Sequence, residues 1–336
     1  MLQRRWYWLV LAGLALLVGI GVFAATVPSG DYLYVPNEAR PVADKVEVED
    51  ETAADAAGGV YYVDVTLRRA RWLDRIAPFV RPDGSTLVPG HAVTSPGQSF
   101  KQRIAAARSE MSRSEQIAAA VAMQAAGLQV DAVPRGALVE SVAVDVPAAG
   151  TLASGDVIVA AAGRQVQTPA QLRDAVGTVD PGDDLTVGFR RNDKRLERTV
   201  RTVAAPDDED RAIIGVSVDQ AVTIRLPLDV EIDLGDVGGP SAGLPFALEV
   251  FQALGNDVDR GYRVAATGKV ELDGSIVSVG GIKQKTYGVR SADADVFLVP
   301  AGENAVTARQ YAGGLRVIGV TSFAEALRVL KTLPAK

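Results

Sequence analysis

The sequence contains no cysteine and only one histidine among its 336 residues. Without cysteine, the chain cannot be a thiol protease, a disulfide-stabilised fold or a cysteine-ligated zinc protein. The one histidine, His91, cannot supply the several ligands of a histidine-rich metal site, and a Ser-His-Asp triad would depend on it. His91 lies in a segment rich in proline, glycine and serine, where polar side chains are usually only solvated. We therefore expect neither a metal site nor a cofactor.

The sequence also has no excess of positive charge. The formal net charge is -6 and the isoelectric point is about 5.1. No basic stripe follows the first residues, so nucleic acid is not an expected partner. The phosphate-loop pattern Gly-x-x-x-x-Gly-Lys-Ser/Thr is absent, so no ATPase is indicated. The length allows two or three domains with cores of their own.

A long uncharged run is present near the N-terminus. Residues 6–27 carry no charge and are numerous enough to cross a bilayer as a helix. Arg4 and Arg5 precede the run, which predicts a cytoplasmic segment at residues 1–5 and an extracellular location after residue 27. A cleaved signal peptide is the alternative, but its apolar core is typically about 7–15 residues long. We therefore expect an uncleaved, single-pass anchor that contacts the lipid bilayer of the cell membrane.

Residues 28–129 are expected to form an extracellular N-terminal region with a strand and helices. β-branched and aromatic residues predict a strand over residues 60–67. Residues 67–80 combine arginines with large apolar side chains, which predicts either a helix at the membrane surface or an amphipathic helix packed on the strand. We favour the second. An alanine-rich stretch predicts another helix over residues 99–127.

Residues 130–205 predict a small β-rich domain with one helix, whose first residues form a capping-box pattern. The run Pro147-Ala-Ala-Gly150, followed by Leu152 and Gly155-Asp-Val-Ile158, resembles a bacterial PDZ domain. The alternative is a module that only separates two other domains, because a fold does not establish a function. The resemblance implies that a peptide docks by strand addition beside the strand that starts at Gly136, Ala137, Leu138 and Val139.

Ser241 is the candidate nucleophile of the C-terminal part. It follows glycines that allow a sharp bend and precedes apolar residues at helical spacing from Leu244 to Leu254. Ser241 would therefore stand at a helix N-terminus, beside backbone N–H groups without helical partners. Those donors and the helix dipole can hold a developing oxyanion.

A serine hydroxyl also needs a base that takes its proton. Without a suitable histidine, lysine is the next candidate, because burial disfavours the ammonium form and lowers the pKa of the amine. Lys283 and Lys285 follow two glycines at the start of a predicted helix. Position alone does not distinguish a catalytic lysine there from two solvent-exposed lysines.

Four blocks in order resemble the proteolytic domain of the Lon family. The blocks are Gly238-Gly-Pro-Ser-Ala-Gly243, Ala266-Thr-Gly268, Gly280-Gly-Ile-Lys-Gln-Lys285 and Val299-Pro300. The resemblance implies that Ser241 is the nucleophile, that Lys285 is the general base, and that Thr267 orients the lysine. It also implies that the backbone of Gly239, Pro240 and Ala242 holds the oxyanion. Two positions differ from the acidic residues usual in the ATP-dependent members, Gly238 and Lys269.

The expected architecture is therefore α+β and multidomain. It has an N-terminal transmembrane helix, a PDZ-like domain, and a C-terminal α/β Lon-type proteolytic domain over residues 206–336. The layout is similar to the YlbL-type membrane-anchored proteases of Gram-positive bacteria. It implies an ATP-independent serine endopeptidase with a Ser-Lys dyad that acts on flexible or unfolded protein segments at the outer membrane face. Lon-type domains often form rings, so a homo-oligomer, with a hexamer as the candidate, is also implied.

Two other functions stay open at this point. The differences at Gly238 and Lys269 suit a non-catalytic, membrane-tethered PDZ scaffold that only binds peptides. The turn at Gly238–Gly243 before a helix could instead hold a phosphate, as in a small-molecule kinase. An extracellular location without an ATP supply disfavours the kinase.

Overall fold

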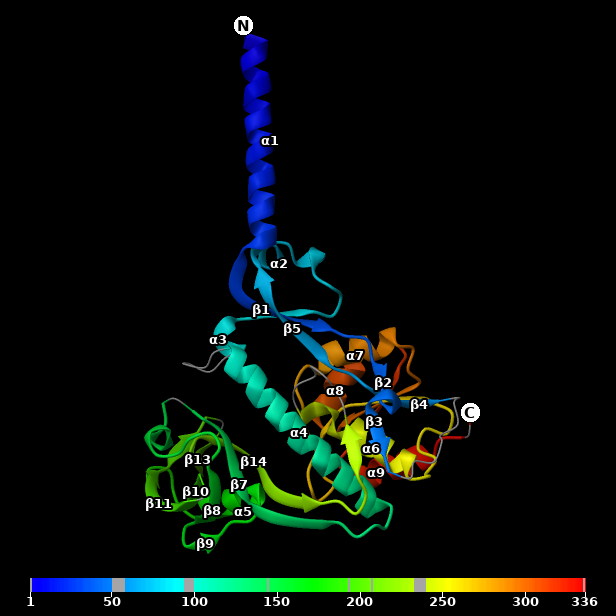
Figure 1. Ribbon diagram of the computed structural model, residues 1–336. Coiled ribbons are helices and arrows are strands. Elements are labelled where there is room, and N and C mark those ends of the chain that lie inside the picture. The colour runs from blue at the N-terminus through cyan, green and yellow to red at the C-terminus, as the bar shows by residue number, and fades with distance from the viewer. Residues whose placement is uncertain are drawn as a thin grey trace. The chain divides into compact units, whose positions relative to one another are not determined.

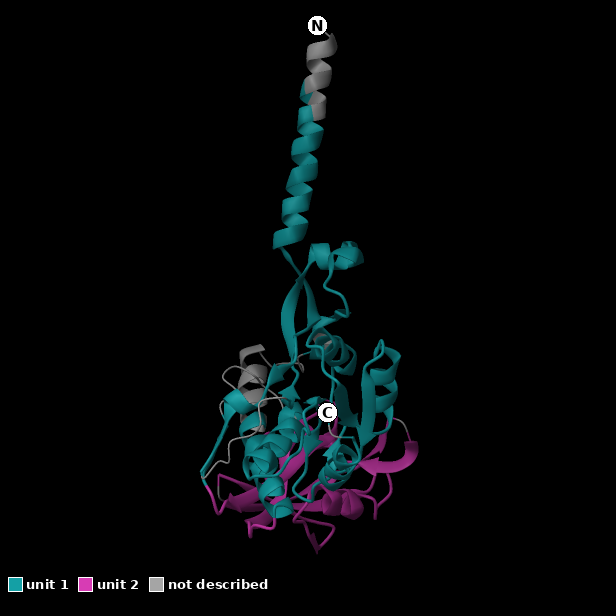
Figure 2. Ribbon diagram, turned by 90° about the vertical axis from the view of Figure 1, so that its right-hand side faces the viewer, with its two compact units in different colours: residues 1–126, 229–336 teal, residues 127–228 magenta. Residues whose placement is uncertain are grey.

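The computed structural model describes all residues except 1, 50–57, 94–99, 144, 193, 207, 233–239 and 335. The chain forms two compact units (Figure 2). Unit 1 combines residues 1–126 with residues 229–336, and unit 2 consists of residues 127–228. Unit 2 is therefore an insertion within the sequence of unit 1, and it includes residues 206–228, which the sequence analysis assigned to the proteolytic domain.

Unit 1 begins with the helix α1 (Leu2–Thr26), shown in Figure 1. Its described large apolar side chains from Leu11 to Phe23 are between 54% and 68% exposed. Within the described part of the chain, no helix combines the length and the apolar character that a membrane span requires. The described helices therefore do not support the membrane span expected over residues 6–27.

A small antiparallel sheet follows α1. Its strands are β1 (Pro28–Pro36), β5 (Val65–Arg71) and β6 (Thr86–Val88), with β1 in the middle. The backbone N–H of Trp72 donates to the carbonyl of Val27 at 3.1 Å, which ties the end of β5 to the base of α1.

Residues 67–80 do not form the single helix that was predicted. Pairing with β1 keeps the chain extended up to Arg71, and then come the short helix α2 (Trp72–Ile76) and the 3-10 turn η2 (Pro78–Val80). Pro78 has no N–H to continue α2, which explains the break. The predicted strand over residues 60–67 is likewise divided, between β4 and β5.

The central sheet of unit 1 has the strand order β2-β4-β16-β19-β20, and β4, β16, β19 and β20 run parallel. Val60 of β4 pairs with Val264 of β16, so the N-terminal region shares a sheet with the C-terminal part. The strand bounds are Arg40–Pro41 (β2), Gly59–Tyr62 (β4), Arg263–Ala266 (β16), Val296–Pro300 (β19) and Arg316–Val320 (β20).

Helices cover both faces of this sheet. On one face α7 (Ile282–Ser291) and α8 (Glu303–Gln310) share a core with buried strand residues such as Phe297. On the other face lie α6 (Gly243–Ala253) and α9 (Phe323–Lys331), joined by an edge-to-face contact of Phe251 and Phe323. The remaining elements of unit 1 are η1 (Ala43–Lys45), β3 (Val46–Val48), α3 (Gly90–Val93), α4 (Phe100–Ala125), β15 (Val230–Ile232), η4 (Pro240–Ala242), β17 (Lys269–Val270) and β18 (Ile276–Val277).

Unit 2 is built on an antiparallel sheet of strand order β11-β10-β8-β7-β14, with β9 beside β8. The helix α5 (Pro169–Val176) adds Leu172, Ala175 and Val176 to the core of this unit, and Thr168 caps its first turn by accepting from the N–H of Gln171. The strands are β7 (Asp131–Val142), β8 (Val157–Ala161), β9 (Arg164–Gln165), β10 (Asp184–Arg191), β11 (Lys194–Arg201), β12 (Val203–Ala205), β13 (Asp208–Ile213) and β14 (Val216–Arg225), and η3 spans Pro147–Gly150.

The strand predicted to receive a peptide is an interior strand. Gly136, Ala137, Leu138 and Val139 lie in β7, which pairs with β8 along one edge and with β14 along the other. The prediction placed a peptide along one edge of β7. The structure corrects it, because β14 pairs with that edge. Among the described strands, β14 ends the sheet.

Candidate active site

Ser241 lies on the turn that leads into α6. It is half-buried within η4, and α6 begins two residues later at Gly243. The N–H of Gly268 donates to the carbonyl of Ser241 at 2.8 Å, and the N–H of Leu244 donates to the carbonyl of Gly268 at 3.0 Å. These two bonds fasten the serine turn to the chain that leaves β16.

Thr267 connects this turn to a lysine. Its side chain is fully buried, and its hydroxyl donates to the carbonyl of Ser241 at 3.0 Å. The same hydroxyl oxygen accepts a hydrogen bond from Nζ of Lys285 at 2.9 Å. The structure thus brings together Ser241, Thr267 and Lys285 from three elements that are distant in sequence.

Lys285 is the buried base candidate. Its position on the first turn of α7 is set by Gly281, whose positive φ of 73° starts the helix and whose carbonyl accepts from the N–H of Lys285. The side chain is 3% exposed. Burial lowers the pKa of Lys285 from 10.5 to about 7, and the carboxylate of Asp64 opposes this change. A substantial fraction of the amine is therefore neutral near pH 7, as a general base requires.

Lys283, on the same helix, has a different environment. It is half-buried, and its ammonium lies 5.5 Å from the ring centre of Tyr311 in a cation–π contact. Lys269, which replaces an acidic residue of the Lon pattern, forms an ion pair with Glu271 at 3.3 Å. The structure therefore separates the two lysines that the sequence alone left equivalent.

The predicted oxyanion site is described only in part. Gly238 and Gly239 lie outside the described residues. Pro240 lacks an N–H and cannot donate, which corrects its inclusion as a donor. Ala242 is buried at the end of η4, next to the first turn of α6. The side chain of His91 also lies outside the described part of the structure.

Two polar residues near the lysine were missed by the sequence analysis. Asp64 follows β4 and is held by Asn37 and Arg40, each at 3.1 Å. Gln284 is buried beside Lys285 on α7 and donates to Thr86 Oγ1 at 2.7 Å. Asp64 and Thr86 both come from the N-terminal region, so no local pattern around Lys285 could have indicated these contacts.

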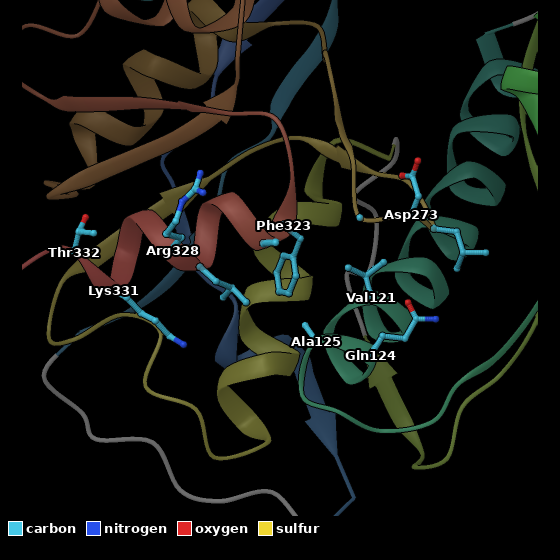
Figure 3. Close-up of a pocket in the computed structure, with 12 residues that line it drawn as sticks. Val121, Gln124, Ala125, Asp273, Phe323, Arg328, Lys331 and Thr332 are labelled. Carbon is cyan, nitrogen blue, oxygen red and sulfur yellow. The ribbon is translucent and has the colours of Figure 1, made fainter.

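An open groove lies away from these residues. It has a volume of about 820 Å³ and runs between α4, which supplies Val121 and Gln124, and α9, which supplies Arg328 and Lys331 (Figure 3). None of Ser241, Thr267 and Lys285 lines it. The groove is therefore separate from the candidate catalytic residues.

Two protein-family models match this chain. Residues 123–202 match the PDZ domain, and residues 225–330 match the C-terminal proteolytic domain of the Lon protease (S16). The chain combines a PDZ domain with a Lon-type protease domain. Ser241, Thr267 and Lys285 all fall within the Lon-type match.

Curated proteins similar to part of this chain include Lon proteases. Lon protease 2 of Bacillus subtilis is 29% identical over 109 residues, which are 32% of this chain and 18% of the relative. The Lon protease of Mesomycoplasma hyopneumoniae is 34% identical over 62 residues, which are 18% of this chain and 7% of the relative. The matched part of the chain thus spans less than a fifth of each of these relatives.

Solved structures are similar to about a quarter of this chain. The PDZ domain of an SdrC-like protein from Listeria monocytogenes is 26% identical, and the match covers 25% of this chain and 86% of that domain, with a TM-score of 0.23. A protein from Geobacillus thermodenitrificans is 32% identical, with coverage of 25% and 97% and a TM-score of 0.23.

Proposed function

We propose that this chain is a membrane-anchored serine endopeptidase with a Ser-Lys dyad. The observation that carries the proposal is the buried amine of Lys285, whose pKa is about 7 and which is hydrogen-bonded to Thr267. The hydroxyl of Thr267 in turn donates to the backbone carbonyl of Ser241. A neutral lysine held this near to a serine turn is the pairing that activates a hydroxyl without histidine.

In the proposed reaction, neutral Lys285 takes the proton of the Ser241 hydroxyl as the oxygen attacks a peptide carbonyl. The lysine then gives this proton to the leaving amine, and water later releases the acyl group from Ser241. Backbone N–H groups at Ala242 and its neighbours, at the start of α6, stabilise the oxyanion. Thr267 keeps the amine pointed at the serine turn.

The substrates are proposed to be flexible or unfolded protein segments. The sequence has no phosphate-loop pattern, so this chain is proposed to work without ATP and without unfolding its substrates. A peptide is proposed to add along β14, which ends the sheet of unit 2 among the described strands, because strand addition takes place at the edge of a sheet.

The location and the assembly are also proposals. The uncharged run of residues 6–27, with exposed apolar side chains along α1, suits a lipid environment, since a helix that is apolar all round requires an apolar surrounding. Arg4 and Arg5 favour a cytoplasmic N-terminus and extracellular domains. The resemblance to Lon-type domains favours a homo-oligomer, with a hexamer as the candidate.

The test is cleavage of denatured casein by the full chain in lipid nanodiscs, compared with Ser241→Ala, Lys285→Ala and Lys283→Ala. We expect the first two variants to be inactive and Lys283→Ala to retain activity. The rate of the unmodified chain should rise with pH around 7, as Lys285 loses its proton. Activity of Lys285→Ala close to that of the unmodified chain would refute the dyad.

The second candidate function is a non-catalytic PDZ scaffold. It is favoured by Gly238 and Lys269, which differ from the Lon pattern. If no variant and no form of the chain cleaves casein while the PDZ domain still binds peptides, the scaffold is the better description.

A further inference from the structure

A cluster of large apolar side chains is exposed at the base of α1. Trp72 is 37% exposed, Ile76 is 62% exposed, Phe79 is 87% exposed and Val80 is 47% exposed. All four belong to α2 and η2, and we call them the α2 surface. Single exposed apolar residues are ordinary, but a contiguous group on one short segment indicates a surface that contacts something apolar.

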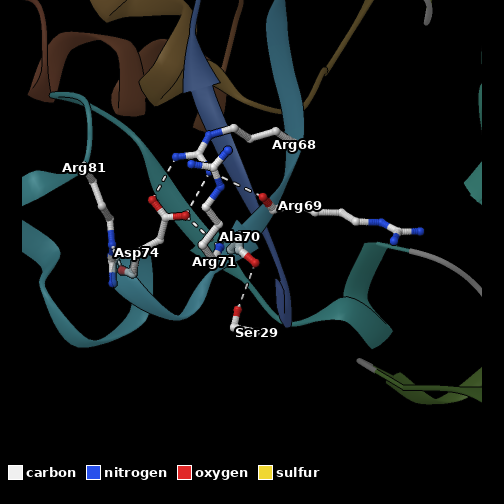
Figure 4. Close-up of polar contacts among 7 residues, drawn as sticks. All are labelled: Ser29, Arg68, Arg69, Ala70, Arg71, Asp74 and Arg81. Carbon is white, nitrogen blue, oxygen red and sulfur yellow. Dashed lines mark hydrogen bonds and ion pairs between the residues drawn. The ribbon is translucent and has the colours of Figure 1, made fainter. Parts of the chain in front are cut away.

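The segment that carries the α2 surface is held in a defined conformation. The buried carboxylate of Asp74 accepts two hydrogen bonds from the guanidinium of Arg68, at 2.8 and 2.9 Å, and one from the N–H of Arg71 at 2.8 Å (Figure 4). Arg81 donates to the backbone carbonyl of Asp74. The pKa of Asp74 is lowered, chiefly by the hydrogen bond from Arg68. These contacts close the loop from both ends, so the apolar side chains are presented by a fixed scaffold.

The α2 surface is adjacent to α1. The N–H of Trp72 donates to the carbonyl of Val27, one residue beyond the end of α1. Arg75 of α2 forms an ion pair with Asp31 of β1 at 3.2 Å. The surface is therefore attached to the end of α1 through short, specific contacts.

Most of the charges around the α2 surface are positive, although Asp31 pairs with Arg75 and the exposed Asp83 follows Arg81. Residues 68–81 contain five arginines and one acidic residue, Asp74, which is buried and paired. Arg69, Arg71 and Arg75 are exposed. Arginines next to tryptophan and phenylalanine match the chemistry of a bilayer interface, where phosphates lie above apolar chains.

We propose that the α2 surface inserts into the interface of the bilayer that α1 crosses, with its arginines against lipid phosphates. This inference rests on the proposed membrane anchor. It adds a second lipid contact to α1, and two contacts restrict rotation of unit 1 about the helix axis in a way that one helix cannot. The occupant is a phospholipid surface, because the apolar cluster, the arginines and the end of α1 all meet at one place.

The experiment uses the absence of cysteine from the chain. Phe79→Cys, Leu16→Cys and Val306→Cys each give one thiol for an environment-sensitive fluorophore on the full chain in phosphatidylcholine–phosphatidylglycerol vesicles. Val306 is the matched control, because it is 54% exposed on α8. Nitroxide-labelled lipids then report contact, with the nitroxide placed either near the headgroup or deep in the acyl chains.

We expect headgroup-region nitroxides to quench the label at residue 79 at least about twofold more than the label at residue 306, as interfacial insertion predicts. Equal quenching at both sites would overturn the inference. A label at residue 79 that is shielded from water but not quenched by lipid would also overturn it and would point to a second copy or another protein on the surface. The label at residue 16 tests the anchor separately: deep nitroxides quench it if α1 spans the bilayer, whatever happens at residue 79.

Discussion

At the scale of single residues, the buried lysine has the largest energetic consequence. A Lys285 ammonium inside the protein has lost most of its hydration, and this loss is what lowers its pKa to about 7. Thr267 gives the amine a hydrogen-bond partner, and the charge of Asp64 offsets the effect of burial only in part. The residue that enables the proposed chemistry is therefore expected to destabilise the fold.

The stability of unit 1 should consequently depend on pH in a defined direction. Between about 7 and 10.5 the unfolded lysine holds its proton while the folded one has lost it, so the free energy of unfolding rises with pH across this window. Below pH 7 the full cost of burying the charge applies. Lys285→Met should therefore stabilise the chain by up to about 5 kcal/mol at pH 6 and by little at pH 10.

Urea unfolding at the two pH values measures this effect. Lys283→Met is the control, because Lys283 lies on the same helix but is only half-buried, against Tyr311. A stabilisation by Lys285→Met that is equal at both pH values would contradict the assignment of a lowered pKa.

Thr267 offers a second prediction at this scale. Thr267→Val removes the hydroxyl that joins Lys285 to the Ser241 turn, whereas Thr267→Ser keeps it. Loss of these hydrogen bonds should lower kcat by about 10- to 100-fold in the valine variant, with little change in KM. The serine variant should restore most of the rate. If both variants are equally slow, the role of Thr267 is packing rather than orientation.

At the scale of elements, Gly136 shows why β7 can lie inside its sheet. A side chain at this position would place its first carbon 2.4 Å from the carbonyl oxygen of Ile158 and 2.8 Å from Val157, and φ is +138°. Only glycine fits such a close approach of two strands. The glycine is therefore required by the contact of β7 with β8.

Gly136→Ala should destabilise unit 2 by about 2–4 kcal/mol, because strand β8 must move or the backbone must strain. Gly150→Ala is the matched control, since open space surrounds that position. Thermal unfolding followed by circular dichroism compares the two. A Gly136→Ala variant as stable as Gly150→Ala would contradict the pairing of β7 with β8.

Elements with a local signal were predicted well, and elements set by distant partners were not. The helices α4 and α6 lie close to the predicted ranges because apolar periodicity is a local signal. The residues Ser241, Thr267 and Lys285 were named through four short blocks of sequence. The pairing of β14 with β7 was not predicted, because the two strands are about 80 residues apart in the sequence. The same distance effect hid Asp64 near Lys285 and Thr86 as the partner of Gln284.

At the scale of the whole molecule, each unit has its own core. The core of unit 2 includes Leu172, Leu185 and Phe189, and a core of unit 1 includes Phe297 and Val299. In unit 2 the buried carboxylate of Asp156 accepts two hydrogen bonds from Arg191, at 2.6 and 2.7 Å, and anchors the loop before β8. Stability changes made in one unit should therefore stay within it.

Scanning calorimetry of the full chain should show two transitions. Asp156→Ala removes the buried carboxylate that accepts from Arg191 and from the N–H of Ala153, and should lower one transition. Lys285→Met at pH 6 should raise the other. The exposed Asp174 gives the control variant Asp174→Ala, which should move neither. A single transition that responds to both variants would show that the two units unfold as one.

The pairing of Val60 with Val264 also constrains how the chain acquires its structure during synthesis. A ribosome adds about 5–20 residues per second, so β4 emerges roughly ten seconds or more before β16 exists to pair with it. During that interval the backbone groups of β4 that later pair with β16 have no strand partner. The intervening PDZ domain can meanwhile complete its own sheet. Unit 1 is thus completed late in translation, and Lys285 cannot become buried until nearly the last strand has been made.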